Sequence, residues 1–365
     1  MKEFLVDTDI TRARTLPASF YRSQSVYDAL TDRVLARSWQ LVGHGRDLER
    51  AGSARPFVLL PGSLDEPLVL TRDLDGGLHC LSNVCSHRGN IVQAHAGDCR
   101  ALRCRYHGRR FALDGTLKSM PEFEGVEGFP ARSDDLPSLS MGELGGLLFA
   151  SLDPIVPFDE LVDPIREMVE RFPMDDLRFD ATRSRDYLVQ AHWALYVDNY
   201  LEGFHIPYVH PELAACVDYE TYRTVIHPWS NVQIAAPRGD APTFDAGASL
   251  GEIAASYVWL FPNTMLNFYP WGLSVNIVQP LAPDRTKVSF LTYVARPELI
   301  DEGAGGSLDK VQREDEEVVE DVQRGIRSRL YRSGRFSPTR EEAVHQFHCL
   351  LGQALTDAPP ARTEP

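Results

Sequence analysis

Two short segments of the sequence each offer one cysteine and one histidine as possible metal ligands. They read Cys85-Ser-His87-Arg-Gly and Cys104-Arg-Tyr-His107-Gly, and the glycine in each allows the tight loop backbone that a metal cluster needs. Cysteines and histidines that alternate in this way are typical of a two-iron, two-sulfur cluster, with the cysteines on one iron and the histidines on the other. The alternative is a zinc site with two cysteines and two histidines, although zinc sites more often separate the two pairs.

Two further cysteines, Cys80 and Cys99, each precede a ligand cysteine by five residues. This symmetry would allow a site made of four cysteines, but such a site would leave His87 and His107 without a role. We therefore interpret Cys80 and Cys99 as buried strand cysteines that flank the two loops.

A second group of possible metal ligands follows further along the chain. Asp198, Glu202 and His205 stand at i, i+4 and i+7, which places them on one face of a predicted helix. Pro207 disfavours helical backbone at the residue before it, so the chain can bend there and bring His210 round. Carboxylates and imidazoles are normal metal ligands and are costly to bury alone, so a metal ion would explain this stripe. The alternative is a half-exposed helix with ordinary surface acids and two unrelated histidines.

Two histidines need a carboxylate to complete the facial ligand set of a non-haem iron site. A helix predicted over residues 309–331 supplies a candidate, because Asp315 falls four residues from both Val311 and Val319 on its apolar stripe. A carboxylate that points towards a core needs a partner, and an iron ion would be one. The alternative is an ordinary acid near the start of the helix. The predicted stripe consists of Val311, Val318, Val319, Val322, Ile326 and Leu330.

The hydrophobic pattern predicts how the chain is organised around these ligands. We expect an N-terminal helical segment at 1–38 that packs with the C-terminal domain, an all-β domain at 39–155 and that C-terminal domain at 156–365. Helices are predicted over residues 17–40, 159–172, 192–206, 309–331 and 339–355. β-rich runs separated by short turns predict an antiparallel meander with strands near 257–261, 265–269, 273–278 and 288–294.

Composition is that of a globular protein and argues against several classes of partner. The chain has 365 residues, of which 43% are hydrophobic and 24% charged, and its formal net charge is −15. Nucleic-acid binding needs a basic face, and acidic membranes repel such a charge, so we expect neither partner. The first residues lack the apolar core of a signal peptide, and no apolar run has the length of a membrane span. We therefore expect a cytoplasmic protein.

In this order, the motifs resemble those of the α subunit of Rieske non-haem iron oxygenases, the aromatic-ring-hydroxylating dioxygenase family. The resemblance rests on the two Cys/His loops and on Asp-Asn-Tyr-x-Glu-x-x-His-x-x-x-x-His at residues 198–210, and it covers nearly the whole chain. Chain length and the Val-Gln-Arg-Gly of residues 322–325 look most like the branch containing choline, glycine betaine and carnitine monooxygenases. The sequence departs from that branch at His192-Trp-Ala, where Asn-Trp-Lys is common, and at Arg105, where proline is common.

The resemblance implies an α+β fold and assigns a role to each candidate residue. A small all-β Rieske domain would be inserted before a larger catalytic domain, whose antiparallel sheet is flanked by helices in a helix-grip-like arrangement. The implied ligands of a [2Fe–2S] cluster are Cys85, His87, Cys104 and His107. The implied ligands of a mononuclear Fe(II) ion are His205, His210 and Asp315. The implied catalytic residues are Asp198, Asn199 and Glu202, and Glu202 would link the two centres.

The same resemblance implies a terminal oxygenase component that uses O2. Electrons would come from NAD(P)H through a separate flavin/iron-sulfur reductase, and this chain has no dinucleotide-binding glycine fingerprint in the expected context. A homotrimer, or a hexamer built from trimers, would bring the cluster of one subunit near the iron of the next.

The substrate class stays open at this point. The favoured reading is hydroxylation or oxidative demethylation of a small substrate, a quaternary or methylated amine. The alternative is an aromatic-ring dihydroxylating dioxygenase, and an electron carrier or zinc-binding module is disfavoured by the second ligand group. Four aromatic residues, one asparagine and one methionine of the predicted sheet are candidates for a pocket that would suit an ammonium ion or an aromatic ring: Tyr257, Trp259, Met265, Asn267, Tyr269 and Trp271.

Overall fold

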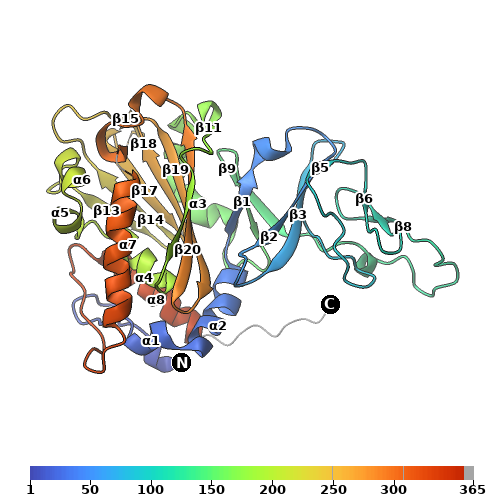
Figure 1. Ribbon diagram of the computed structural model, residues 1–365, viewed down its shortest axis with the longest axis horizontal. Helices are drawn as coiled ribbons and strands as arrows, with labels where there is room; N and C mark the ends of the chain where they lie inside the picture. The colour runs from blue at the N-terminus through green and yellow to red at the C-terminus, as the bar shows by residue number, and fades with distance from the viewer. Residues whose placement is uncertain (249, 307, 357–365) are drawn as a thin grey trace. The chain divides into compact units, whose positions relative to one another are not determined.

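The computed structural model describes residues 1–356, with the exception of residues 249 and 307. The chain divides into two compact units (Figure 1): Ala36–Ile155 form one, and Met1–Leu35 join the chain from Val156 onward to form the other. In the described part of the chain, no helix combines the length and apolar character needed to cross a membrane.

The smaller unit contains three short antiparallel sheets. Their strand orders are β4-β3-β2-β5, β1-β10-β9 and β6-β7-β8. A single core of buried side chains, including Val69, Leu81 and Phe111, also takes in two of the predicted cluster ligands, Cys85 and Cys104. The strands are β1 (Gln40–His44), β2 (Ser53–Leu59), β3 (Glu66–Arg72), β4 (Leu78–Ser82), β5 (Gly97–Asp98), β6 (Leu102–Arg103), β7 (Arg110–Phe111), β8 (Leu117–Ser119), β9 (Ser140–Leu144) and β10 (Leu147–Ser151).

The larger unit is built on one antiparallel sheet. Its strand order is β11-β20-β19-β18-β17-β14-β13, and β12 also pairs with β20. Strands β17 to β20 are neighbours in both sequence and space, so the predicted meander is confirmed. The strands are β11 (Arg178–Phe179), β12 (Arg185–Val189), β13 (Arg223–His227), β14 (Ser230–Ala235), β17 (Ala255–Leu260), β18 (Thr264–Tyr269), β19 (Gly272–Ala282) and β20 (Arg285–Val294), with a separate pair of β15 (Phe244–Asp245) and β16 (Glu252–Ile253).

The helices of this unit pack on one another and on the sheet. In Figure 1, α7 runs alongside the sheet, and it packs on α4 and β12, while α8 packs on α2. The helices are α1 (Ala18–Arg22), α2 (Gln24–Arg33), α3 (Phe158–Arg171), α4 (Trp193–Tyr200), α5 (Ile206–Val209), α6 (Pro211–Cys216), α7 (Leu308–Gly325) and α8 (Glu342–Thr356).

Two of the predicted helices, at 17–40 and 309–331, differ in extent from the helices observed. The segment 17–40 holds two separate helices, because the Ser23 side chain accepts the N–H of Val26 and starts a new helix there. The helix predicted over 309–331 ends at Gly325, and Leu330 beyond it is 94% exposed.

The buried face of α7 also differs from the predicted apolar stripe. Val322 is 43% exposed, whereas Gln312, Val319 and Gln323 are buried. The glutamines tolerate burial because they are paired: Gln312 accepts from Tyr196, and Gln323 accepts the backbone N–H of His192. The spacing of apolar residues alone therefore predicts a buried face of α7 that is slightly rotated from the observed one.

Candidate functional site

Two loops of the smaller unit carry the four predicted cluster ligands. Cys85 and His87 lie after β4, and Cys104 and His107 lie between β6 and β7. The glycine of each loop donates its N–H to the carbonyl oxygen of the loop's cysteine over 3.0 Å: Gly89 to Cys85, and Gly108 to Cys104. Both glycines have a positive φ, 69° for Gly89 and 76° for Gly108. The two imidazole rings lie 4.8 Å apart, so the loops present both pairs of ligands at one place.

The environment of Cys104 favours the thiolate, the form of cysteine that binds iron. Burial raises the pKa of this thiol, but hydrogen bonds from the Tyr106 backbone and from Cys85 and Asn90 outweigh burial and lower the pKa below its ordinary value. Burial also raises the pKa of Cys85, and burial on β4 raises the pKa of Cys80 to about 12, so Cys80 keeps its proton. The four loop residues, with Cys80 outside the set, fit a [2Fe–2S] cluster held by two thiolates and two imidazoles.

An ion pair between a buried arginine and a partly exposed aspartate joins the two ligand loops. Arg109, which follows the second loop, is 1% exposed and donates to Asp134 Oδ1 over 2.8 Å. Ser86 of the first loop donates to the backbone oxygen of the same Asp134 over 2.7 Å. The sequence analysis missed Asp134, because its contacts are 25 and 48 residues away along the chain.

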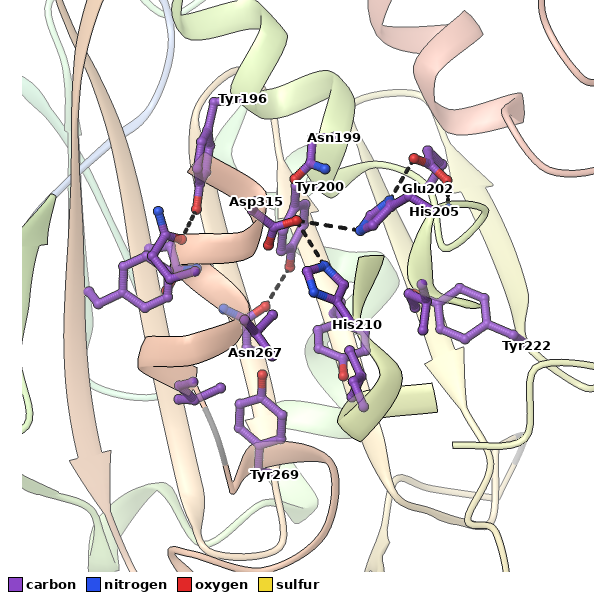
Figure 2. A pocket seen from close by; sticks show the side chains of 18 residues that line it. Tyr196, Asn199, Tyr200, Glu202, His205, His210, Tyr222, Asn267, Tyr269 and Asp315 are labelled. Atoms are coloured by element: carbon purple, nitrogen blue, oxygen red, sulfur yellow. Dashed lines mark hydrogen bonds and ion pairs between the residues drawn. The ribbon is translucent and has the colours of Figure 1, made fainter. Parts of the chain in front are cut away.

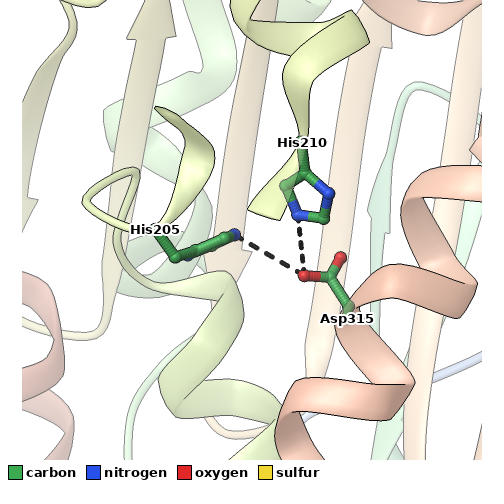
Figure 3. A group of neighbouring side chains, drawn as sticks. All are labelled: His205, His210 and Asp315. Atoms are coloured by element: carbon green, nitrogen blue, oxygen red, sulfur yellow. Dashed lines mark hydrogen bonds and ion pairs between the residues drawn. The ribbon is translucent and has the colours of Figure 1, made fainter. Parts of the chain in front are cut away.

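Three side chains from separate segments meet in the larger unit (Figure 3). His205 lies after α4, His210 lies between α5 and α6, and Asp315 projects from α7. Their ligand atoms all lie within 4.8 Å of one another. Asp315 Oδ1 is 2.9 Å from Nε2 of His210 and 3.5 Å from Nε2 of His205. Two imidazole nitrogens that converge on one carboxylate are a donor set that fits a divalent iron ion.

The outer ring nitrogen of each histidine contacts a second acid. Nδ1 of His205 lies 2.7 Å from Glu202, and Nδ1 of His210 lies 2.7 Å from Glu314. Burial lowers the pKa of His210, but its contacts with Asp315 and Glu314 outweigh burial and raise the pKa. The two outer acids orient the rings so that both Nε2 atoms face the centre. The sequence analysis missed Glu314, since its 104-residue separation from His210 hides the contact.

Helix α4 ends at Tyr200, so the prediction of one helix over 192–206 with its acids and His205 on one face is wrong. Glu202 lies in the turn after the helix. Its carboxylate accepts the backbone N–H of Phe204 and, over 3.0 Å, that of His205, while it also contacts the His205 ring. Glu202 thus holds both the backbone and the side chain of His205 in place.

Two residues explain why the chain turns here instead of continuing as a helix. A Cβ at Gly203 would lie 2.6 Å from the Tyr222 ring, so the close approach at this point requires glycine. Pro207 stands in the first turn of α5, where its missing N–H costs no hydrogen bond, and a short helix restarts there. That restart brings His210 back towards His205.

Of the other two predicted catalytic residues, Asp198 contacts neighbouring helices, whereas Asn199 lines a cavity. Asp198 contacts Nε2 of His348 over 2.9 Å and accepts from the Tyr21 hydroxyl over 3.2 Å, so it ties α4 to α8 and α1. Asn199 lines the cavity beside the iron-binding set. The predicted catalytic roles of both residues remain predictions.

A cavity of about 620 Å³, including its open mouth, adjoins the iron-binding set (Figure 2). Glu202 and the three predicted iron ligands form part of its wall. Of the residues expected from the sheet, Tyr257, Asn267 and Tyr269 line it, whereas Trp259, Met265 and Trp271 do not. The aromatic lining consists of Tyr196, Tyr200, Tyr222, Tyr257, Tyr269 and Phe290.

Comparisons with known proteins identify both parts of the chain. Residues 38–130 match the Rieske [2Fe-2S] domain, and residues 174–357 match the ring hydroxylating alpha subunit (catalytic domain). Choline monooxygenase of Arabidopsis thaliana is 33% identical over 97% of this chain and 86% of its own length. The carnitine monooxygenase oxygenase subunit of Escherichia coli K12 is 30% identical over 94% of this chain and 95% of its own.

Solved structures show the same fold. The quaternary ammonium Rieske monooxygenase CntA superposes with a TM-score of 0.77 at 25% identity, over 97% of this chain and 98% of CntA. Naphthalene 1,2-dioxygenase from Rhodococcus sp. shares the fold with a TM-score of 0.70 at 18% identity, over 95% of each chain.

Fold and ligand groups together define a Rieske non-haem iron oxygenase, an oxidoreductase with a [2Fe–2S] cluster and a mononuclear iron. This chain belongs to the ring-hydroxylating α-subunit family. The resemblance of the motifs is therefore confirmed, and with it the α+β fold in which a Rieske domain precedes the catalytic domain.

Proposed function

We propose that this chain is a terminal oxygenase component that hydroxylates or oxidatively demethylates a small quaternary or methylated amine. The observation that carries the proposal is the position of His205, His210 and Asp315 in the wall of a cavity rich in tyrosine rings. Ring faces attract ammonium ions, and relatives that cover most of the chain are choline and carnitine monooxygenases.

The residues named above would hold the two metal groups. Cys85, His87, Cys104 and His107 would bind the cluster, and His205, His210 and Asp315 would bind Fe(II). When bound, the two groups would supply the electrons and the O2 chemistry that amino-acid side chains cannot supply. In the overall reaction, one oxygen atom of O2 would be inserted into a C–H bond of the substrate and the other would leave as water.

The chain's own residues would orient and enclose the substrate. The tyrosine rings hold the ammonium group next to the iron-binding set, and the buried cavity wall excludes water from the reacting carbon. Glu202 keeps Nε2 of His205 aimed at the centre through its contact with Nδ1. We propose that Glu202 also links this centre to His107 of the partner subunit.

Further proposals concern assembly, supply of electrons and location. A separate flavin/iron-sulfur reductase that oxidises NAD(P)H would supply the electrons, and the oxygenase would assemble as a homotrimer or a hexamer of trimers. One solved structure of CntA is described as giving insight into inter-subunit electron transfer, which supports such an assembly. We keep the cytoplasm as the proposed location, and 1–38, 39–155 and 156–365 as the proposed domain division.

Metal content and product analysis test the proposal together. Anaerobically purified protein should contain about three irons per chain, two in the cluster and one mononuclear. With a reductase and ¹⁸O2, a trimethylammonium substrate should give a product that carries one labelled oxygen, or formaldehyde from an oxidised methyl group. Incorporation of two oxygen atoms into an aromatic ring, with no reaction of methylated amines, would instead establish the dihydroxylating alternative.

A further inference from the structure

The tyrosine hydroxyls in the cavity are arranged as hydrogen-bond acceptors for a ligand. Three of them donate their protons to amide oxygens of the protein: Tyr196 to Gln312, Tyr200 to Asn267, and Tyr222 to Gln233. Burial raises the pKa of these three tyrosines well above the ordinary value, so the hydroxyls stay protonated and neutral. A hydroxyl whose proton is already donated can offer a ligand only its lone pairs.

Two of the amides that accept those protons each donate one N–H to a backbone carbonyl oxygen. Nδ2 of Asn267 donates to the Ser274 carbonyl over 3.2 Å, and Nε2 of Gln233 donates to the Tyr200 carbonyl over 2.7 Å. Asn267, Ser274 and Gln233 lie on the sheet, Tyr200 ends α4, and Gln312 lies on α7, so regular elements hold most of the pattern. This part of the wall therefore presents ring faces and oxygen lone pairs, both of which are electron-rich.

The charged residues of the cavity have the same sign. Of the lining residues that the structure describes, Glu202 and Asp315 are carboxylates and none is a lysine or an arginine. Lys310 adjoins the lining residue Val311 along α7, but it lines a separate cavity and contacts Glu212 over 2.6 Å. Within this described lining, a bound anion would have no side-chain counter-charge.

We propose that the substrate of this cavity is an ammonium ion that carries no carboxylate, such as an amino alcohol with a quaternary or tertiary nitrogen. The inference rests on the proposed function and narrows it. A cation gains from ring faces and lone pairs, and a neutral hydroxyl finds acceptors. The carboxylate of a betaine would lose its water without gaining a lysine or arginine partner among the described lining residues, which is costly.

Binding measured without turnover tests the inference. The iron-loaded holoenzyme, kept anaerobic and without reductase, is titrated calorimetrically with four probes: choline, its neutral isostere 3,3-dimethylbutan-1-ol, glycine betaine and carnitine. We expect choline to bind at least about tenfold more tightly than each of the other three. Equal or tighter binding of glycine betaine or carnitine would overturn the inference while leaving the proposed function intact.

A reciprocal substitution sharpens the test. Val311 lines the cavity from α7 and is only half-buried, so Val311→Lys can place an ammonium group there without opening the core. We expect Val311→Lys to weaken choline binding about tenfold and to improve glycine betaine binding, whereas the size control Val311→Met should do neither. A loss of choline binding equal in both variants would show that shape and not charge selects the ligand, against the inference.

Two further outcomes separate the possible failures. If Lys310→Met abolishes binding of a betaine that the unaltered protein binds well, the neighbouring lysine supplies the counter-charge and the inference is wrong. If no ammonium compound binds but a neutral aromatic such as naphthalene does, the proposed function itself is wrong, and the inference is lost with it.

Discussion

Carboxylates at the outer nitrogens of His205 and His210 set the geometry of the mononuclear centre. Each acid lies 2.7 Å from an Nδ1 atom and thereby fixes which ring nitrogen faces Asp315. Such outer contacts orient a ligand before the metal arrives and raise its basicity. Glu314 does this for His210 from the residue next to Asp315 on α7.

Replacing Glu314 should therefore weaken iron binding without removing a ligand. We expect Glu314→Gln to lower the affinity for mononuclear iron roughly 10-fold, and Glu314→Ala up to about 100-fold, while the cluster stays intact. Competition with a chelator measures the affinity, and the spectrum of the reduced cluster checks the other centre. Glu317→Gln, an exposed acid of the same helix, is the control. Unchanged iron affinity in both Glu314 variants would contradict the orienting role.

At the scale of elements, a buried histidine starts helix α4. His192 is fully buried among aromatic rings, including Phe20 and Tyr21, and its Nδ1 accepts the N–H of Ala194 over 3.2 Å. Burial lowers the pKa of His192 from 6.5 to about 3, so the ring stays neutral in the folded protein. Protonation of Nδ1 would remove the acceptor that caps the helix.

This arrangement predicts a loss of stability in mild acid. Below pH 6.5 the unfolded chain binds a proton at His192 that the folded chain does not bind until about pH 3, so stability falls as pH falls through this window. The slope from this group should approach about 1.4 kcal/mol per pH unit. In thermal unfolding, His192→Asn should lose less stability in acid than the unaltered protein, because asparagine keeps a capping acceptor but does not titrate. The exposed control His95→Asn should behave as the unaltered protein does, and identical pH curves for all three would refute the assignment.

The two cluster loops depend on one acid. Asp134 accepts hydrogen bonds from buried Arg109 and from Ser86. A hydrogen bond from a backbone N–H to its carboxylate, and the hydrogen bond and charge of Arg109, hold the pKa of this carboxyl below the ordinary value. Its carboxylate contributes stability above the ordinary pKa, and that contribution is lost as pH falls through the lowered value.

Substitution of Asp134 should loosen the loops. We expect Asp134→Asn to destabilise the protein by about 1–3 kcal/mol at neutral pH, because a buried guanidinium loses a charged partner. Thermal unfolding and the rate of cluster loss measure the effect, and the exposed Glu124→Gln serves as control. The difference in unfolding free energy between Asp134→Asn and the unaltered protein should shrink in acid. A difference that stays constant down to pH 3 would argue against the ion pair.

At the scale of the whole molecule, each compact unit carries one ligand group. The predicted cluster ligands lie within Ala36–Ile155, and the residues that could bind the mononuclear iron lie in the unit that continues from Val156. A trimer in which electrons cross between subunits would need an intact cluster in one chain and an intact iron site in its neighbour.

Mixed assemblies test this arrangement. Cys104→Ser should abolish the cluster and Asp315→Ala the mononuclear iron, so each variant alone should be inactive. Co-assembled in one trimer, the two variants should recover partial turnover, because an intact cluster can lie beside an intact iron site across an interface. The control mixes the two separately assembled variants without subunit exchange. Absence of recovery in verified mixed trimers would mean that electrons stay within one chain.

The sequence by itself determined the ligand types, their order and the meander that carries the cavity. Paired Cys/His loops and the Glu202 to His210 spacing are local features, and alternating side chains define strands, so short windows of sequence contain them. Asp315 could also be chosen, since a single acid among valines stands out on a helix.

Only the tertiary structure decided which groups surround those ligands. The contacts of Glu314 with His210 and of Asp134 with Arg109 join distant segments, and no local period encodes them. The requirement for glycine at position 203 comes from the ring of Tyr222, which packs against it from a later part of the chain. The direction in which each cavity hydroxyl donates is likewise set by partners on other elements, and that direction makes the cavity electron-rich.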